Sequence, residues 1–133
     1  MVMADEQKVS LGEKSILVIE DDPFLVKAYQ IKFAQEGAAV TAITDGKQAV
    51  EYIKAHTPPH IVLLDIMLPG MSGFEILKEL RGIATWKDVP VIILTNLGQS
   101  QDMDKAKELG AQEYIVKANS RITDIIDRVK HYL

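Results

Sequence analysis

Three short runs of the sequence, residues 16–20, 61–65 and 91–95, are continuously apolar up to their last residue and rich in isoleucine and valine. A strand with one face in water alternates apolar and polar side chains, so these runs predict strands that are covered on both faces. Strands of this kind are usually parallel. Residues 38–44 and 113–117 show a weaker strand pattern, and we expect them toward the edges of the same sheet. The sequence therefore predicts a five-stranded parallel sheet.

The segments between these strands have the features of helices. Asp45 can cap a helix, Ser72 and Glu75 spell a capping box, and Gly110 stands where a glycine commonly follows a helix. Strands that alternate with helices through right-handed crossovers give an open α/β sheet with helices on both faces. Two helices carry apolar side chains at helical spacing: Leu25, Tyr29 and Phe33 in the first, and Ile122, Ile125, Ile126, Val129 and Leu133 in the last.

Length and composition limit the domain count and the class of function. A chain of 133 residues with 47% hydrophobic residues has the size of one domain, which we place at residues 15–133 after a flexible segment at residues 1–14. A net charge of −4 argues against direct binding to nucleic acid. The absence of cysteine excludes disulfides and thiolate metal sites. No apolar run approaches about 18 residues, so we expect a cytoplasmic protein without membrane contact.

Polar residues follow the apolar runs at the points where the strands should end. In open α/β sheets the working crevice lies beyond the carboxyl ends of the strands. Acids gathered there are costly unless a cation balances them, and oxygen ligands with waters suit Mg²⁺. The acids of the first and third strands can meet only if those strands are neighbours, which favours the strand order 2-1-3-4-5 over 3-2-1-4-5. The polar residues at the strand ends are Glu20, Asp21, Asp22, Asp65, Thr95, Asn96 and Lys117.

These residue types together match the needs of phosphoryl transfer to an aspartate. Such a transfer requires a carboxylate nucleophile, cations that neutralise charge and a hydroxyl that orients phosphoryl oxygens. Asp65 is the natural nucleophile. Taken singly, Asp65 could cap a turn, Thr95 could bond its own backbone and Lys117 could be solvated. Their placement on one edge of one sheet favours a functional site.

Four segments, ILVIEDDP, IVLLDIMLPGMSGFE, VIILTN and EYIVKA in that order, resemble the receiver domain of bacterial two-component response regulators. The resemblance covers about residues 15–133 and implies the flavodoxin-like receiver fold. It implies that Asp65 is the phosphoacceptor and that Glu20 and Asp21 are the acidic pair, with Glu20 acting through water. The backbone carbonyl of Met67 would be a further ligand for Mg²⁺, or for Mn²⁺ in its place.

The same resemblance implies a switch and its partners. Thr95 would move onto the phosphoryl group, Lys117 would pair with it, and Tyr114 would turn inward as Thr95 shifts. The phosphoryl donor would be a histidine kinase or phosphotransfer protein, and the chain would promote its own phosphorylation and dephosphorylation without being a turnover enzyme. A downstream protein would bind the face formed by the fourth helix, the strand at 113–117 and the last helix. A monomer or weak dimer is expected, either as a stand-alone receiver or as part of a longer regulator or hybrid kinase.

Two residues depart from the family pattern. Ala118 stands where a proline, often in a cis bond, usually follows the lysine, so the Lys117–Ala118 bond is either a strained cis bond or a trans bond with a different lysine approach. Asn96 stands where a small residue is common, and it could narrow access to Asp65 or hydrogen-bond the phosphoryl group. We also expect Trp86, in a polar loop, to be only partly packed.

Three other functions remain as alternatives. An aspartyl-nucleophile phosphatase would need a general acid two residues after Asp65, where Met67 cannot donate a proton. A nucleotide or flavin site would need a phosphate cradle where the chain has carboxylates at Glu20 and Asp21. A receiver used only as an interaction scaffold, never phosphorylated, is the third alternative. Ala118 and Asn96 give it some weight, but the set of acids at the strand ends argues against it.

Overall fold

The sheet has five parallel strands in the order β2-β1-β3-β4-β5, which confirms the predicted order. The computed structural model describes residues 14–133, so the expected flexible segment at residues 1–14 lies outside the described residues except for Lys14. The two strands with the weaker sequence pattern, β2 and β5, form the edges, as expected. The strands are β1 (Ser15–Ile19), β2 (Ala39–Ile43), β3 (Ile61–Leu64), β4 (Val91–Thr95) and β5 (Glu113–Val116).

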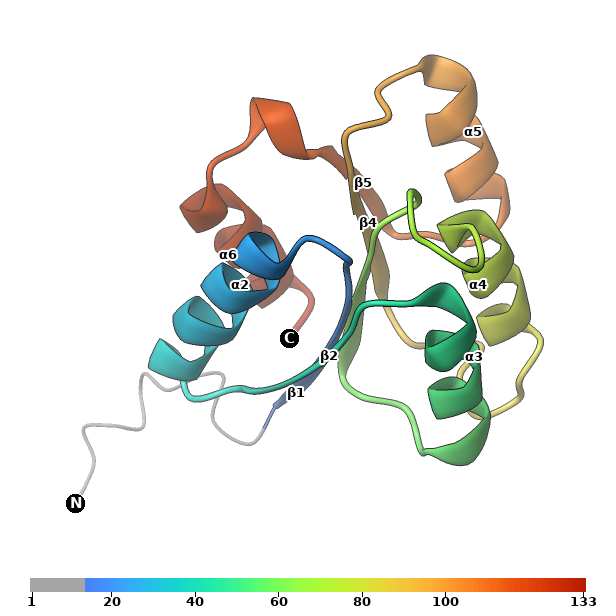
Figure 1. Ribbon diagram of the computed structural model, residues 1–133, viewed down its shortest axis with the longest axis horizontal. Helices are drawn as coiled ribbons and strands as arrows, with labels where there is room; N and C mark the ends of the chain where they lie inside the picture. The colour runs from blue at the N-terminus through green and yellow to red at the C-terminus, as the bar shows by residue number, and fades with distance from the viewer. Residues whose placement is uncertain (1–13) are drawn as a thin grey trace.

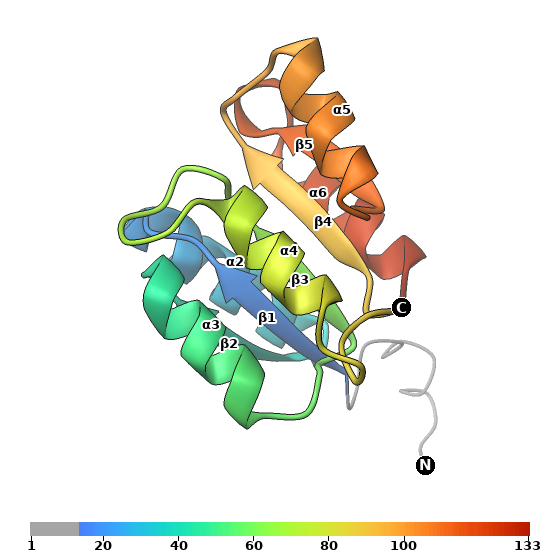
Figure 2. The ribbon, with the colours of Figure 1, turned by 90° about the vertical axis from the view of Figure 1, so that its right-hand side faces the viewer.

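Helices cover both faces of the sheet (Figure 1, Figure 2). The helices α2 and α6 lie on one face, and α3, α4 and α5 lie on the other. The last helix ends at His131, two residues before the end of the chain. No helix within residues 14–133 is long and apolar enough to cross a bilayer. The helices are α2 (Pro23–Gln35), α3 (Gly46–Ala55), α4 (Gly73–Arg81), α5 (Ser100–Glu108) and α6 (Ile122–His131), and the short 3-10 helix η2 (Lys117–Asn119) follows β5.

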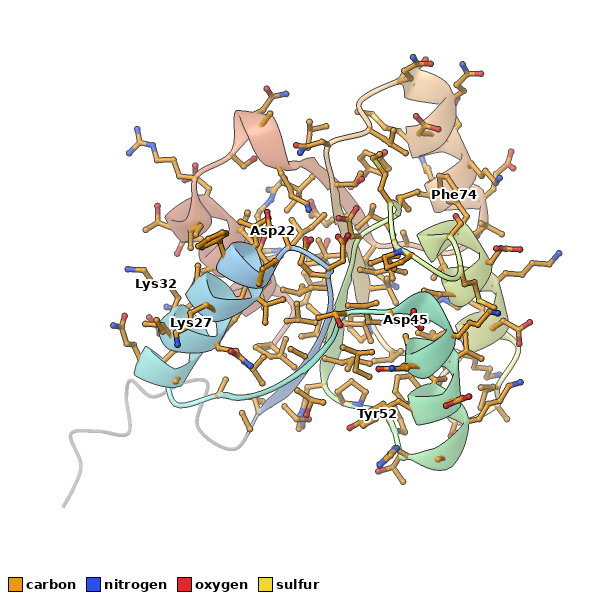
Figure 3. The ribbon with its side chains drawn as sticks, in the orientation of Figure 1. Asp22, Lys27, Lys32, Asp45, Tyr52 and Phe74 are labelled. Carbon is orange, nitrogen blue, oxygen red and sulfur yellow. The ribbon has the colours of Figure 1, made fainter. Side chains whose placement is uncertain are left out.

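Side-chain caps fix where three helices begin at the carboxyl edge of the sheet. The Asp45 carboxylate accepts the backbone N–H groups of Lys47 and Gln48, and Ser72 forms the predicted capping box at the start of α4. Asp22 caps α2 in the same way, and its carboxylate is not among the three that converge at the end of the sheet. Figure 3 shows Asp22 and Asp45 where α2 and α3 begin.

The core has one layer on each side of the sheet, because alternate residues of each buried strand face opposite helices. Ile16 and Val18 pack beneath α2 and α6, whereas Leu17 and Ile19 pack against the other three helices. Trp86 belongs to the second layer and is 0% exposed, so the expectation of partial packing was wrong. Its indole N–H donates to the carbonyl oxygen of His56 at 3.0 Å, which satisfies the polar group that burial would otherwise leave unpaired.

Candidate functional site

β1, β3 and β5 end one residue before the predicted runs do, which places Glu20, Asp65 and Lys117 just beyond the sheet, whereas β4 ends at Thr95 as the run does. Ile19 pairs with Leu64 at the ends of β1 and β3. Glu20 and Asp65 therefore leave two neighbouring strands side by side. Lys117 follows β5 in the same way, at the start of η2. The carboxyl edge of the sheet thus gathers two acids and an amine from distant parts of the chain.

The amine of Lys117 bridges the two buried acids. Its Nζ lies 2.6 Å from Glu20 Oε1 and 2.7 Å from Asp65 Oδ2. Burial raises the pKa of Glu20, against the opposing effect of the hydrogen bond from Lys117. Burial alone would lower the pKa of Lys117, but its hydrogen bonds to Asp65 and Glu20 outweigh burial and raise that pKa. Lys117 is therefore held as a cation at the site.

Backbone N–H groups hold the remaining oxygens of both acids. Met67 donates its N–H to Asp65 Oδ1 at 3.1 Å, and Asp22 donates its N–H to Glu20 Oε2 at 3.0 Å. Asp65 is 5% exposed, and each oxygen of its carboxylate accepts one hydrogen bond. It is an oriented carboxylate at a fixed position.

Three acids at this edge suit a divalent cation. Glu20, Asp21 and Asp65 each offer a carboxylate oxygen, and these atoms lie within 4.8 Å of one another. Three carboxylates carry −3 and Lys117 supplies +1, so the group has a formal charge of −2. Asp21 is exposed and accepts no hydrogen bond within residues 14–133, so its carboxylate is free to bind a metal ion. An oxygen-only donor set with this charge fits Mg²⁺ or Mn²⁺ better than a softer metal ion.

An open pocket lies over these acids. Met67 and Asn96 line it together with Asp65 and Lys117, but Thr95 does not. Thr95 is 0% exposed, and its Oγ1 accepts the N–H of Leu97 at 3.4 Å. The structure therefore brings the acids and Lys117 together, but it leaves the Thr95 hydroxyl directed at its own loop.

Tyr114 contacts the same loop from β5. Its hydroxyl donates to the carbonyl oxygen of Leu97 at 2.6 Å, so Leu97 contacts both Thr95 and Tyr114. The phenol is half-buried, and burial raises its pKa. Any displacement of Thr95 that moves Leu97 will also disturb Tyr114.

The structure decides between the two alternatives for the Lys117–Ala118 bond, and it shows two features that the sequence did not predict. The bond is trans, as are all peptide bonds of residues 14–133, and Lys117 still reaches Asp65. Asn96 Oδ1 accepts the N–H of Ala118 at 3.1 Å. The hydroxyl of Tyr29 on α2 is buried and has no hydrogen-bond partner within residues 14–133. The only sequence signal for Tyr29 was a hydroxyl group at an apolar position of the first helix.

Comparison with known proteins identifies the family. The family described as "Response regulator receiver domain" matches residues 16–130, which is most of the chain. The chain belongs to this family. The sensory transduction protein RegX3 of Mycobacterium bovis is 38% identical over 120 residues, which are 90% of this chain and 50% of that protein. This receiver domain spans about half the length of the curated relatives it matches.

Solved receiver domains have the same fold. The BeF3-activated N-terminal receiver domain of Klebsiella pneumoniae RstA aligns with a TM-score of 0.78 at 30% identity, over 89% of this chain and 97% of that one. The receiver domain of the sensor histidine kinase PA1611 from Pseudomonas aeruginosa aligns with a TM-score of 0.79 at 24% identity, over 90% and 96% of the two chains, and its active-site cleft coordinates a magnesium ion. The first similarity agrees with the family assignment, and the second is a similarity of fold.

Proposed function

We propose that residues 15–133 act as a cytoplasmic receiver domain that accepts a phosphoryl group on Asp65 from the phosphohistidine of a histidine kinase or phosphotransfer protein. One observation carries this proposal. A single carboxylate is oriented by the Met67 N–H and by the Lys117 amine, beside two further acids and at the floor of an open pocket. Such an arrangement suits a nucleophile that must attack an anionic phosphoryl group.

The transfer is an in-line displacement at phosphorus. A carboxylate oxygen of Asp65 forms a bond to phosphorus, the bond from phosphorus to the donor's imidazole nitrogen breaks, and its electron pair stays on the imidazole. The Lys117 amine already lies 2.7 Å from Asp65, where it can neutralise charge on the phosphoryl oxygens. Hydrolysis of the acyl phosphate restores Asp65. The chain promotes both steps on itself and is not a turnover enzyme.

Glu20, Asp21, Asp65 and the backbone carbonyl of Met67 would hold Mg²⁺ or Mn²⁺. When bound, the ion supplies charge neutralisation at the phosphoryl oxygens. Asp21 is suited to direct contact, because no protein donor in residues 14–133 occupies its carboxylate. Both carboxylate oxygens of Glu20 accept protein N–H groups, which suits contact through water.

Phosphorylation would act on a partner surface through Thr95 and Tyr114. Converting the carboxylate into an acyl phosphate adds about one negative charge and new acceptor oxygens. Thr95 would leave the N–H of Leu97 for a phosphoryl oxygen, and Tyr114 would respond because it bonds the same residue. The responding surface is the face formed by α5, β5 and α6, where a downstream protein would bind. A coupling of about 1–3 kcal/mol would suffice for such a switch.

The deciding experiment is intact-mass measurement after incubation with Mg²⁺ and acetyl phosphate. The wild-type chain should gain the mass of one phosphoryl group, and Asp65→Asn should gain none. Asp45→Asn is the matched control, because Asn also caps helices and Asp45 lies outside the site. If Asp65→Asn gains the same mass as the wild type, Asp65 is not the phosphoacceptor. If the wild type fails with acetyl phosphate, a phosphorylated histidine phosphotransfer protein is the second donor, and failure with both would reject the proposal.

A further inference from the structure

A hydrogen bond joins the residues that directly follow Thr95 and Lys117. Asn96 comes directly after Thr95, and Ala118 comes directly after Lys117. Thr95 and Val116 are the last paired positions of β4 and β5. One step beyond the sheet, Asn96 Oδ1 accepts the N–H of Ala118 at 3.1 Å. A side chain thus continues the connection between the two strands after their backbone pairing has ended.

This bond lies in the turn that carries Lys117. Lys117 opens the 3-10 helix η2, and no side chain at the N-cap position of η2 accepts a hydrogen bond from it. The first N–H groups of a helix have no partner within the helix. The Asn96 oxygen satisfies one of them from a segment 22 residues away. Asn96 therefore caps the turn that carries Lys117.

The orientation of the Asn96 amide follows from its partner. The Ala118 N–H can meet only an acceptor, so Oδ1 faces Ala118 and the amide NH₂ is the free end of the side chain. This NH₂ has no hydrogen-bond partner within residues 14–133. Asn96 is exposed and lines the same pocket as Asp65 and Lys117.

We propose that Asn96 is a positioning residue for phosphoryl uptake, because it holds the turn at Ala118 and so keeps the Lys117 amine in reach of Asp65. The inference rests on the proposed function of Asp65. Asn96 acts through the backbone of its neighbour and takes no part in bond making. A proline at position 118 would have no N–H to donate, so this way of holding Lys117 depends on the presence of a residue such as alanine there.

The test combines phosphorylation kinetics with amide hydrogen exchange. Three variants are compared with the wild type: Asn96→Ala removes the acceptor, Asn96→Asp keeps an acceptor oxygen, and Asn119→Ala alters an exposed asparagine of the same turn that makes no such bond. The rate of phosphorylation by acetyl phosphate is measured against donor and Mg²⁺ concentration. Exchange of the Ala118 amide is measured by NMR without donor or metal.

In Asn96→Ala, the maximal phosphorylation rate should fall about tenfold, because a misplaced lysine loses its alignment with the reacting group. The Mg²⁺ concentration for half-maximal rate should stay within about twofold, since Asp21 and Met67 are untouched. Exchange of the Ala118 amide should quicken about tenfold in this variant only. In Asn96→Asp, the Ala118 amide should stay protected from exchange. The added negative charge should raise the concentration of acetyl phosphate, an anionic donor, that gives half the maximal rate.

Each remaining outcome has a definite meaning. If the wild type is phosphorylated on Asp65 and Asn96→Ala matches Asn119→Ala in maximal rate, Asn96 has no positioning role and the proposed function stands. An Ala118 amide that exchanges equally fast in the wild type and in Asn96→Ala would also overturn the inference. If the wild type takes up no phosphoryl group from either donor, the proposed function fails and the inference fails with it.

Discussion

Lys117 lies 2.7 Å from Asp65 and at the same time 2.6 Å from Glu20, so one amine pairs with two buried carboxylates. Glu20 is 2% exposed and Asp65 is 5% exposed. Charges in such surroundings are stable only while they are paired and hydrogen-bonded. The position of Lys117 therefore matters for folding as well as for chemistry.

Lys117→Met should destabilise the fold, because it leaves Glu20 and Asp65 facing each other without a cation. Removing one partner from a buried ion pair costs about 3 kcal/mol. Urea unfolding measures this loss, and added Mg²⁺ should restore part of it. Lys107→Met, which alters an exposed lysine without an ion pair in the described chain, is the control and should change stability by less than about 0.5 kcal/mol. Equal stability of the two variants would contradict the structural role of Lys117.

Mg²⁺ should raise the melting temperature through Asp21. An ion that binds only the folded chain stabilises it by about 2.7 kcal/mol at a concentration of 100 Kd. Asp21→Asn should abolish most of this gain while leaving the stability without metal nearly unchanged, because Asp21 is exposed and accepts no hydrogen bond in the described chain. Thermal unfolding in a Mg²⁺ titration measures both effects.

Asp22→Asn is the matched control for the metal titration. It removes one charge beside Asp21, and Asn retains the cap of α2. Mg²⁺ should therefore still raise the melting temperature of Asp22→Asn. If Mg²⁺ raises the melting temperature of neither Asp21→Asn nor Asp22→Asn, overall negative charge, and not the position of Asp21, attracts the ion.

The continuous apolar runs made the sheet predictable, because strands with this pattern are buried on both faces and such strands are typical of parallel sheets covered by helices. The strand order followed from chemistry, since the acids of the first and third strands could meet only between neighbouring strands. Glu20, Asp21, Asp65 and Lys117 were thus placed together from the sequence alone. Their roles in phosphoryl transfer remain predictions.

Two features that the sequence did not predict join segments far apart in the chain. Asn96 and Ala118 each looked like an isolated departure from the family pattern, yet they are partners in one hydrogen bond. Trp86 sits among polar neighbours, but its indole reaches His56, which is 30 positions away. Local pattern carries no information about such contacts until the backbone is placed.

Gly73→Ala should disturb the site through the backbone of Asp65. A Cβ on Gly73 would overlap the Asp65 carbonyl oxygen and come within 2.7 Å of the Ile66 Cα, so α4 can approach the end of β3 only with glycine at this position. Overpacking of this kind costs about 2 kcal/mol. Urea unfolding should show that loss, and the rate of phosphorylation should fall with it.

Gly82→Ala separates this effect from the general cost of replacing a helix glycine. At Gly82 the nearest atom to an added Cβ is 3.4 Å away, and φ is −80°, which alanine adopts readily. This variant should be as stable as the wild type or slightly more stable. Comparable losses in Gly73→Ala and Gly82→Ala would mean that contact with Asp65 is not the cause.

Tyr29→Phe should stabilise the fold, because the Tyr29 hydroxyl is buried and finds no hydrogen-bond partner in the described part of the chain. Removing an unsatisfied buried hydroxyl while keeping the ring should add about 1 kcal/mol at neutral pH. Burial, together with the negative charge of Glu20, raises the pKa of Tyr29 to about 12.

The raised pKa gives the Tyr29→Phe prediction a second readout at alkaline pH. Above the ordinary pKa of 10.0 the unfolded chain loses the phenol proton, whereas the folded chain keeps it until the pH reaches about 12. The wild type therefore keeps its full free energy of unfolding below pH 10, and ionisation of Tyr29 in the unfolded chain lowers it by about 2–3 kcal/mol as the pH rises to 12. Tyr29→Phe should escape this loss, so the stability difference between the two proteins should widen over that range in urea unfolding. A constant difference from pH 7 to pH 12 would show that the hydroxyl is hydrated or hydrogen-bonded in solution.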